Sequence, residues 1–391
     1  MSPDLDVTEL QAMVRRVFQP GPDDRCLAIL VDLPDEVVPD TPDWKARRTM
    51  ATQWWRRLAE APNKLGLEAV QLVHFRNTRA NNADLPEAGF VHVSGAPPAA
   101  MDQVRGHEVT FANLFETCQI FLAPTQFSLT APLKRAATRY RFRAATMPGF
   151  SQAMIPALRL DYARIASRVD RLKALLDDAI RCDLTFRVHD DLYRLSLDLR
   201  HRKAHASSGV FPNPGTAGNL PSGEAYIVPY EGEHEGDPSR TAGTLPVQLG
   251  EEVILYRVEE NVAVQVLSRG TRSEEEARKL EEEPAYGNLA ELGLGVLGDF
   301  GLEPSGEILL DEKLGLHIAF GRSEHFGGRV GPDAFSRPDR VVHIDRVYVP
   351  SVQPRVIVEE AHLVSSQGAP HLLMARGEYR IDFNDREQLP R

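Results

Sequence analysis

Cysteines are scarce in this sequence, and their scarcity excludes one class of protein. Only three of the 391 residues are cysteine, namely Cys26, Cys118 and Cys182. They are widely spaced, odd in number and form no CxxC pair, so no disulfide framework is expected. Cys26 and Cys118 lie inside apolar runs, which predicts buried free thiols in a reducing compartment.

Signals for membranes and for export are also missing. No stretch approaches the roughly 18 consecutive apolar residues that a membrane-spanning helix requires. The acidic first segment, MSPDLDVTELQAM, lacks the apolar region of a signal peptide. We therefore expect a cytoplasmic protein without a membrane partner.

Basic clusters and the common catalytic signatures do not occur either. The formal net charge is −11, which argues against a nucleic-acid partner because phosphate binding needs clustered Lys and Arg. The sequence contains no HExxH, GxSxG or Walker A pattern. One formal dinucleotide fingerprint, GLGVLG from Gly293 to Gly298, lies deep in the second half with no helix-forming run after it. We expect no nucleotide site there.

The length and the pattern of apolar residues predict two domains. A chain of 391 residues exceeds the usual size of one hydrophobic core. In the first half, apolar strands at residues 26–33 and 68–75 alternate with amphipathic helices. Repeated units of this kind are typical of an α/β fold with a doubly wound, mostly parallel sheet.

A change of apolar period near residue 180 marks the expected domain boundary. Apolar residues at three- and four-residue steps predict a long helix over 161–180, and alternation then predicts a hairpin over 182–199. We place the boundary between residues 198 and 199, which leaves a mixed α+β domain at 199–391. Its expected strands and its charged helix lie at residues 252–256, 262–267, 316–320, 341–349 and 273–283.

Candidate metal ligands lie in this second domain. In the strand at 341–349, alternate residues share a face, so His343 and Asp345 point the same way and can supply an imidazole and a carboxylate to one metal. His317 stands in a second apolar strand. Taken alone, each of these features is more commonly a hydrogen-bonded surface pair or a hydrogen-bonded core histidine.

Two glutamates extend this set of ligands. Glu224 and Glu291 are both flanked by apolar residues and glycines. A carboxylate buried there must be paired, protonated or metal-bound, because burying it alone is costly. Together with the two histidines and Asp345, these glutamates predict a buried, carboxylate-rich metal site.

Ordered motifs resemble those of the M29 family of thermophilic aminopeptidases, the aminopeptidase T group. The likeness covers roughly residues 124–350. Its segments are ATMPG at 145–149, NLPSGE at 219–224 with AYIVP after it, AELGLG at 290–295, DEK at 311–313, HIAFG at 317–321, Gly327-Gly328 and HID at 343–345.

The resemblance implies a hydrolase that removes N-terminal amino acids from small peptides. It implies two divalent ions, zinc, cobalt or manganese, and a homodimer. The implied metal ligands are Glu224, Glu291, His317, His343 and Asp345, and the two glutamates are also the implied catalytic residues. Two divalent ions against three carboxylates leave a charge of about +1, which can polarise a scissile carbonyl.

One departure from the family concerns a tyrosine seven residues after the first histidine. This sequence has Glu324 there, with Arg322 and His325 beside it, so these three residues are candidates for the surroundings of the metals. Two other functions stay open. The resemblance extends to 2,5-dihydroxypyridine dioxygenases, in which one Fe(II) would use His317, His343 and Asp345. Retention of both glutamates favours two metals. A member without catalysis, acting in assembly or binding, is the third alternative.

Overall fold

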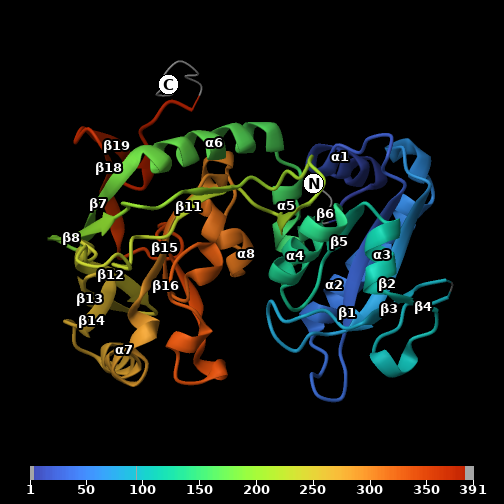
Figure 1. Ribbon diagram of the computed structural model, residues 1–391, viewed down its shortest axis with the longest axis horizontal. Helices are drawn as coiled ribbons and strands as arrows, with labels where there is room; N and C mark the ends of the chain where they lie inside the picture. Colours follow the sequence, from blue (N-terminus) through green and yellow to red (C-terminus); the bar gives the residue numbers. More distant parts are fainter. Residues whose placement is uncertain (1–3, 94, 384–391) are drawn as a thin grey trace. The chain divides into compact units, whose positions relative to one another are not determined.

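The computed structural model describes residues 4–93 and 95–383, and the chain forms two compact units (Figure 1). The first unit comprises Met1–Ala166 and Ser207–Ser222, and the second comprises Ser167–Ala206 and Gly223–Arg391. The boundary expected between residues 198 and 199 therefore differs from the observed division. The predicted hairpin pairs with strands of the second unit, while the segment Ser207–Ser222 returns to the first.

The first unit is built on a seven-stranded sheet with the order β10-β6-β5-β1-β2-β3-β4. The five strands from β10 to β2 are parallel, whereas β3 and β4 are antiparallel additions at one edge. This confirms the expected α/β class with a mostly parallel sheet. The strands are β1 (Cys26–Leu33), β2 (Ala69–Arg76), β3 (Ala88–Val91), β4 (His107–Thr110), β5 (Ile120–Ala123), β6 (Arg143–Thr146) and β10 (Thr216–Asn219).

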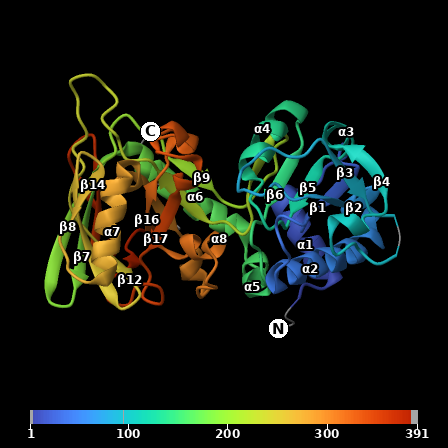
Figure 2. The same cartoon turned by 90° about the horizontal axis from the view of Figure 1, so that it is seen from below.

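Helices cover both faces of this sheet. Figure 2 shows α3 (Phe111–Thr117) and α4 (Thr130–Tyr140) on one side, and α1 (Val7–Phe18) and α2 (Pro42–Ala59) on the other. A short helix, α5 (Ile155–Leu158), follows β6. Because both faces are covered, all eight residues of β1 are buried, which explains its continuous apolar sequence.

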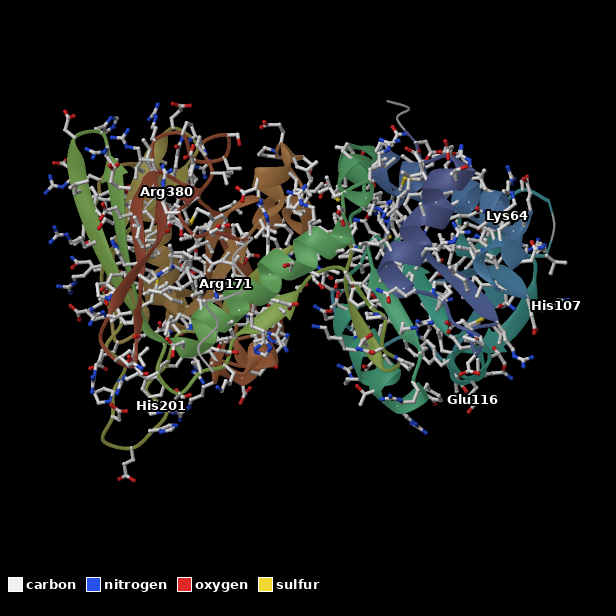
Figure 3. The ribbon with its side chains drawn as sticks, turned by 90° about the horizontal axis from the view of Figure 1, so that it is seen from above. Lys64, His107, Glu116, Arg171, His201 and Arg380 are labelled. Atoms are coloured by element: carbon white, nitrogen blue, oxygen red, sulfur yellow. A yellow bond between two sulfur atoms is a disulfide. The ribbon has the colours of Figure 1, made fainter. Side chains whose placement is uncertain are left out.

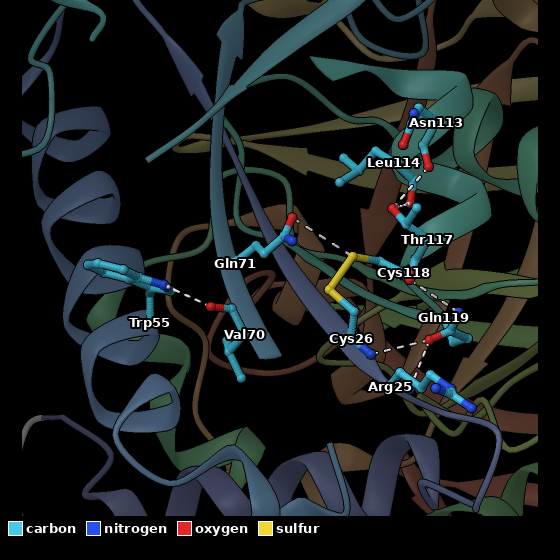
Figure 4. Close-up of a disulfide and its surroundings, with 10 residues drawn as sticks. All are labelled: Arg25, Cys26, Trp55, Val70, Gln71, Asn113, Leu114, Thr117, Cys118 and Gln119. Atoms are coloured by element: carbon cyan, nitrogen blue, oxygen red, sulfur yellow. Dashed lines mark hydrogen bonds between the residues drawn. A yellow bond between two sulfur atoms is a disulfide. The ribbon is translucent and has the colours of Figure 1, made fainter. Parts of the chain in front are cut away.

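Cys26 and Cys118 form a disulfide, so the expectation that both are buried free thiols is wrong (Figure 4). Cys26 begins β1, and Cys118 caps the end of α3 just before β5, the parallel neighbour of β1. The Gln119 side chain accepts a hydrogen bond from the Cys26 backbone N–H, and the two Cα atoms lie 4.5 Å apart. A pairing across 92 residues depends on sheet order, which cysteine spacing does not reveal. Cys182 is a buried free thiol.

The second unit contains two sheets. A five-stranded sheet has the order β17-β16-β15-β11-β9, and an eight-stranded sheet has the order β14-β13-β12-β8-β7-β18-β19-β20. The strands are β7 (Ala179–Val188), β8 (Asp191–Asp198), β9 (His205–Ser207), β11 (Glu224–Ile227), β12 (Ala242–Leu249), β13 (Glu252–Glu259), β14 (Val262–Val266), β15 (Leu289–Gly295), β16 (Leu316–Gly321), β17 (His343–Val347), β18 (Ile357–Ser365), β19 (Pro370–Ala375) and β20 (Glu378–Tyr379).

The apolar core of the second unit includes aromatic pairs that join its strands. The Phe320 ring on β16 lies 5.1 Å from the Tyr256 ring on β13, and the Phe186 ring on β7 lies 5.0 Å from that of Tyr348. The helices α6 (Tyr162–Asp178), α7 (Thr271–Glu282) and α8 (Ile308–Asp311) complete the chain. Phe320 lies on one face of the five-stranded sheet, and His317 and Ala319 on the same strand lie on the other.

Polar side chains extend from the outer surfaces of both units (Figure 3). None of the helices within residues 4–93 and 95–383 combines the length and the apolar character that crossing a bilayer requires.

Candidate metal centre

Four neighbouring strands present the predicted ligands on one face of the five-stranded sheet. Glu291 on β15 lies in register with Ala319, and Ala319 with Asp345 on β17. His317 on β16 and His343 on β17 lie two residues away along their strands, and side chains two apart share a face. Glu224, at the start of β11, is paired with Gly295. All five residues predicted from sequence are therefore brought together.

Glycines on β15 create the space that this cluster occupies. A β-carbon added to Gly293 would lie 2.0 Å from His317 Nε2, and one added to Gly295 would lie 2.3 Å from the Lys313 carbonyl carbon. The His317 imidazole therefore lies directly against β15 at Gly293, and the Lys313 backbone lies against it at Gly295. This packing accounts for the glycine-rich sequence GLGVLG, and the helix that a dinucleotide fingerprint needs is replaced by a 3₁₀ turn at Leu297–Phe300.

Glu291 is the central carboxylate of the cluster. Its Oε1 lies 3.3 Å from His317 Nε2, and its Oε2 lies 3.4 Å from His343 Nε2. His317 Nε2 is also 3.6 Å from Glu224 Oε2, and His343 Nε2 is 3.5 Å from Asp345 Oδ1. The two histidines thus face different oxygens of one carboxylate.

The backbone fixes the orientation of His343. Its Nδ1 lies 2.8 Å from the carbonyl oxygen of Arg322, to which it donates a hydrogen bond in the neutral Nδ1–H tautomer. This leaves Nε2 directed at Glu291 and Asp345. A metal-binding histidine commonly has its second ring nitrogen held in this way.

Two residues of the centre, Glu312 and Lys313, were not identified from sequence as functional. They lie in the 3₁₀ turn Glu312–Leu314, just before β16. Lys313 Nζ donates to Glu224 Oε1 at 2.5 Å and to Glu312 Oε1, and its side chain is 1% exposed. The available signal was the single lysine between the apolar runs ILL and LGLHIAF, since a buried ammonium needs an anionic partner.

Opposing charges set the ionisation of Glu291 and the histidines. Burial alone would raise the pKa of Glu291, but His317 and His343 outweigh it and bring that pKa down to about 2. Burial alone would lower the pKa of His317, but Glu291 and Glu224 raise it to about 9. Burial alone would also lower the pKa of His343, but Asp345 and Glu291 raise it well above its usual value. The histidines therefore hold protons that a metal ion would have to replace.

Burial dominates the ionisation of the other two glutamates. It raises the pKa of Glu224 against the opposing effects of Lys313 and His317, and it raises the pKa of Glu312 to about 8. The pKa of Lys313 is also raised, because Glu224 and Glu312 outweigh its burial. Lys313 is therefore a permanent cation at the edge of the cluster.

The donor set fits divalent metal ions. Two groups have ligand atoms that all lie within 4.8 Å of one another, one formed by Glu224, Glu291 and His317 and the other by Glu291, His343 and Asp345. Within the described chain, the buried Glu224 Oε2 accepts no hydrogen bond. A buried carboxylate oxygen without a donor fits a cation site. The mixture of carboxylate and imidazole suits zinc, cobalt, manganese or iron.

The residues at the position of the family tyrosine surround the cluster and are in neither group of ligands. Glu324 accepts two hydrogen bonds of 2.6 Å from the Arg322 guanidinium, so its carboxylate is already neutralised. The ring of His325 lies 5.3 Å from the ring of His343, and burial lowers the pKa of His325 to about 4. Tyr226, which shares the ligand face of β11, places a buried phenol ring 4.9 Å from that of Phe326.

The whole chain resembles two solved enzyme structures in fold. The first is 2,5-dihydroxypyridine dioxygenase from Pseudomonas putida, with a TM-score of 0.60 and 15% sequence identity, covering 97% of this chain and 100% of that chain. The second is wild-type AmpT from Thermus thermophilus, with a TM-score of 0.52 and 18% identity, covering 96% and 98% respectively. No protein-family model and no curated protein matches the sequence.

The scaffold expected from the ordered motifs is thus confirmed at the level of the fold. At these identities a likeness shows shared architecture, and chemistry has to be argued from the site itself. The site has a buried set of carboxylates and imidazoles that could bind metal.

Proposed function

We propose that this protein is a metal-dependent hydrolase of the aminopeptidase type, which releases N-terminal residues from small peptides with two divalent ions. Zinc, cobalt and manganese suit its mixed donors. The ligands would be Glu224, Glu291 and His317 for one ion and Glu291, His343 and Asp345 for the other.

The observation that carries the proposal is the position of Glu291 in both groups. Each of its oxygens faces a different histidine, at 3.3 Å and 3.4 Å. A carboxylate whose two oxygens each reach a different imidazole could be shared by two ions, and a single ion does not need such sharing. Glu224 adds a further carboxylate on the side of His317.

The chemistry follows from charge and from orientation. Divalent ions at such a site would polarise a scissile carbonyl and activate water for attack. The Arg322 carbonyl oxygen keeps His343 Nε2 directed into the site, and Lys313 holds one oxygen of Glu224. Glu224, Glu291 and His317 are buried, and burial strengthens the interactions among these charges.

Metal analysis and peptidase assays test the proposal. Protein purified without chelator should contain two divalent ions per chain and should release amine from aminoacyl anilides supplied with Zn(II), Co(II) or Mn(II). Glu291→Gln should lose metal and activity together, because an amide cannot bridge two cations. Glu276→Gln is the matched control, since Glu276 is a buried carboxylate of the same unit that is bonded to Tyr256 and Tyr286.

An Fe(II) dioxygenase is the second candidate, and the fold likeness to 2,5-dihydroxypyridine dioxygenase favours it. One iron would then use His317, His343 and Asp345, a combination of two histidines and one carboxylate. Turnover of dihydroxylated aromatics would require Fe(II) and oxygen, and Glu224→Gln would be tolerated. If the hydrolase proposal is right, Glu224→Gln is nearly as damaging as Glu291→Gln.

The peptidase and dioxygenase assays also test the third alternative, a non-catalytic protein that acts in assembly or binding. Release of amine with any of the three metals supports the hydrolase, and consumption of oxygen with Fe(II) supports the dioxygenase. Bound metal without turnover in either assay would overturn both and leave a non-catalytic binding protein.

A further inference from the structure

Lys313 touches only one of the two metal-binding groups. We propose that this buried ammonium makes the groups unequal, so that a divalent ion binds first at Glu291, His343 and Asp345. Binding of the second ion at Glu224, Glu291 and His317 is held back by Lys313. This inference rests on the proposed two-metal function, and it concerns the order and strength of binding.

The position of Lys313 is fixed by its surroundings. Its side chain is 1% exposed, and its Nζ bonds to Glu224 Oε1 at 2.5 Å and to Glu312. Its backbone lies against the bare surface of Gly295, where a β-carbon would come within 2.3 Å. The ammonium is therefore held beside Glu224 by packing as well as by charge.

The cations that face the carboxylates of the other group are the histidines themselves, whose protons a metal ion would replace. Among the described residues, no lysine or arginine forms an ion pair with Glu291 or Asp345, whose ion-pair partners are His317 and His343. Its side chains are also more accessible, since His343 is 20% and Asp345 is 9% exposed, against 6% for Glu224. Glu291 is common to both groups, so the groups differ in their other carboxylate. Within the described residues Asp345 forms no ion pair with a lysine, whereas Glu224 is already shared with Lys313.

Zn(II) titration of the metal-free 391-residue chain measures the two binding steps. Calorimetry with chelator competition should resolve a tight and a weaker step in the wild type. Asp345→Asn should weaken the tight step, which assigns it to the group containing Asp345.

Two substitutions should move the weaker step in opposite directions. Lys313→Met should strengthen it by about tenfold or more, because a like charge a few Å away is removed. Glu312→Gln should weaken it, because the ammonium then has Glu224 as its single carboxylate. Lys313→Arg, which keeps the charge, should stay near the wild type.

Controls separate this electrostatic role from a structural one. A purely structural role would weaken both steps in Lys313→Met and in Glu312→Gln alike. Lys279→Met removes another lysine paired with a buried glutamate, 2.6 Å from Glu276, and should leave both steps unchanged. Thermal unfolding in chelator identifies a variant that fails to fold, and the Glu312→Gln result then still decides the outcome.

The possible failures are distinguishable. If no Zn(II) binds to the wild type, the two-metal function itself is wrong. If two ions bind and Lys313→Met leaves the weaker step unchanged or weakens it, the proposed role of Lys313 is overturned while the metal centre stands.

Discussion

Gly293 and His317 lie opposite each other on neighbouring strands, and the imidazole occupies the space where any other residue would place a β-carbon. That carbon would lie 2.0 Å from both Nε2 and Cε1 of His317. The glycine is therefore required by close packing, and it acts on the site through the position of one candidate ligand, His317.

Gly293→Ala tests this relationship. The His317 ring must move, so we expect metal affinity to fall by about ten- to a hundredfold, and stability to fall by about 1–3 kcal/mol because the site is overpacked. Metal titration and urea unfolding measure the two effects. Gly21→Ala is the control, because its β-carbon would meet no atom closer than 3.9 Å. If Gly293→Ala keeps the metal affinity of the wild type, the His317 ring can shift without loss of metal binding, and the proposed packing requirement is wrong.

Glu324→Gln should leave the metal content unchanged. The Glu324 carboxylate is bound by Arg322 through two hydrogen bonds of 2.6 Å and belongs to neither group of ligands. The pair is partly exposed, so we expect a stability loss below about 1 kcal/mol. Elemental analysis of the purified variant checks the first statement, and loss of one ion per chain would make Glu324 a ligand after all.

The candidate ligands could be grouped from the sequence because strand alternation fixes which side chains share a face. His343 and Asp345 stand two apart on β17, and the strand carries them onto one face of the sheet. The alternating units in the first half likewise predicted its mostly parallel sheet. Such features depend on residues close together in the sequence.

The features that were missed depend on residues brought together by tertiary structure. Lys313 reaches Glu224 across 89 residues from a turn whose path the local sequence does not define. Ser207–Ser222 belongs to the first unit because β10 pairs with β6. The spacing of apolar residues in the sequence does not indicate that pairing. The disulfide between Cys26 and Cys118 also depends on sheet order.

Thiol titration tests the disulfide. In denaturant without reductant the protein should expose one thiol, that of Cys182, and after reduction it should expose three. Replacing Cys26 and Cys118 by alanine should destabilise the first unit by about 2–5 kcal/mol, the usual effect of losing a long-range disulfide. Three reactive thiols before reduction would show that the bond is not formed.

The first unit can be followed on its own because all three tryptophans, Trp44, Trp54 and Trp55, lie in α2. Unfolding by urea, monitored through tryptophan fluorescence, therefore reports the disulfide variants and the effect of pH on this unit. The same signal is insensitive to metal loss in the second unit unless the two unfold together.

His74 should make the first unit sensitive to acid. Burial, with smaller effects from His92 and Arg48, lowers its pKa from 6.5 to about 3. Between pH 6.5 and pH 3 the unfolded chain binds a proton at His74, whereas the folded protein keeps His74 neutral. The free energy of unfolding is therefore unaffected by His74 above pH 6.5 and decreases as the pH falls toward 3. Between pH 7 and pH 5 the loss attributable to His74 is about 2 kcal/mol.

His74→Phe removes this titration, and its ring can retain the packing against His92, whose ring centroid lies 5.5 Å away. The quantity to compare is the change in unfolding free energy between pH 7 and pH 5, since any constant effect of the substitution then cancels. We expect that change to be smaller in the variant by about 2 kcal/mol. His107→Phe is the matched control, because it replaces an exposed histidine on β4 of the same sheet. Equal pH dependence in His74→Phe and the wild type would mean that His74 is protonated without cost in the folded state, which its burial at 3% exposure argues against.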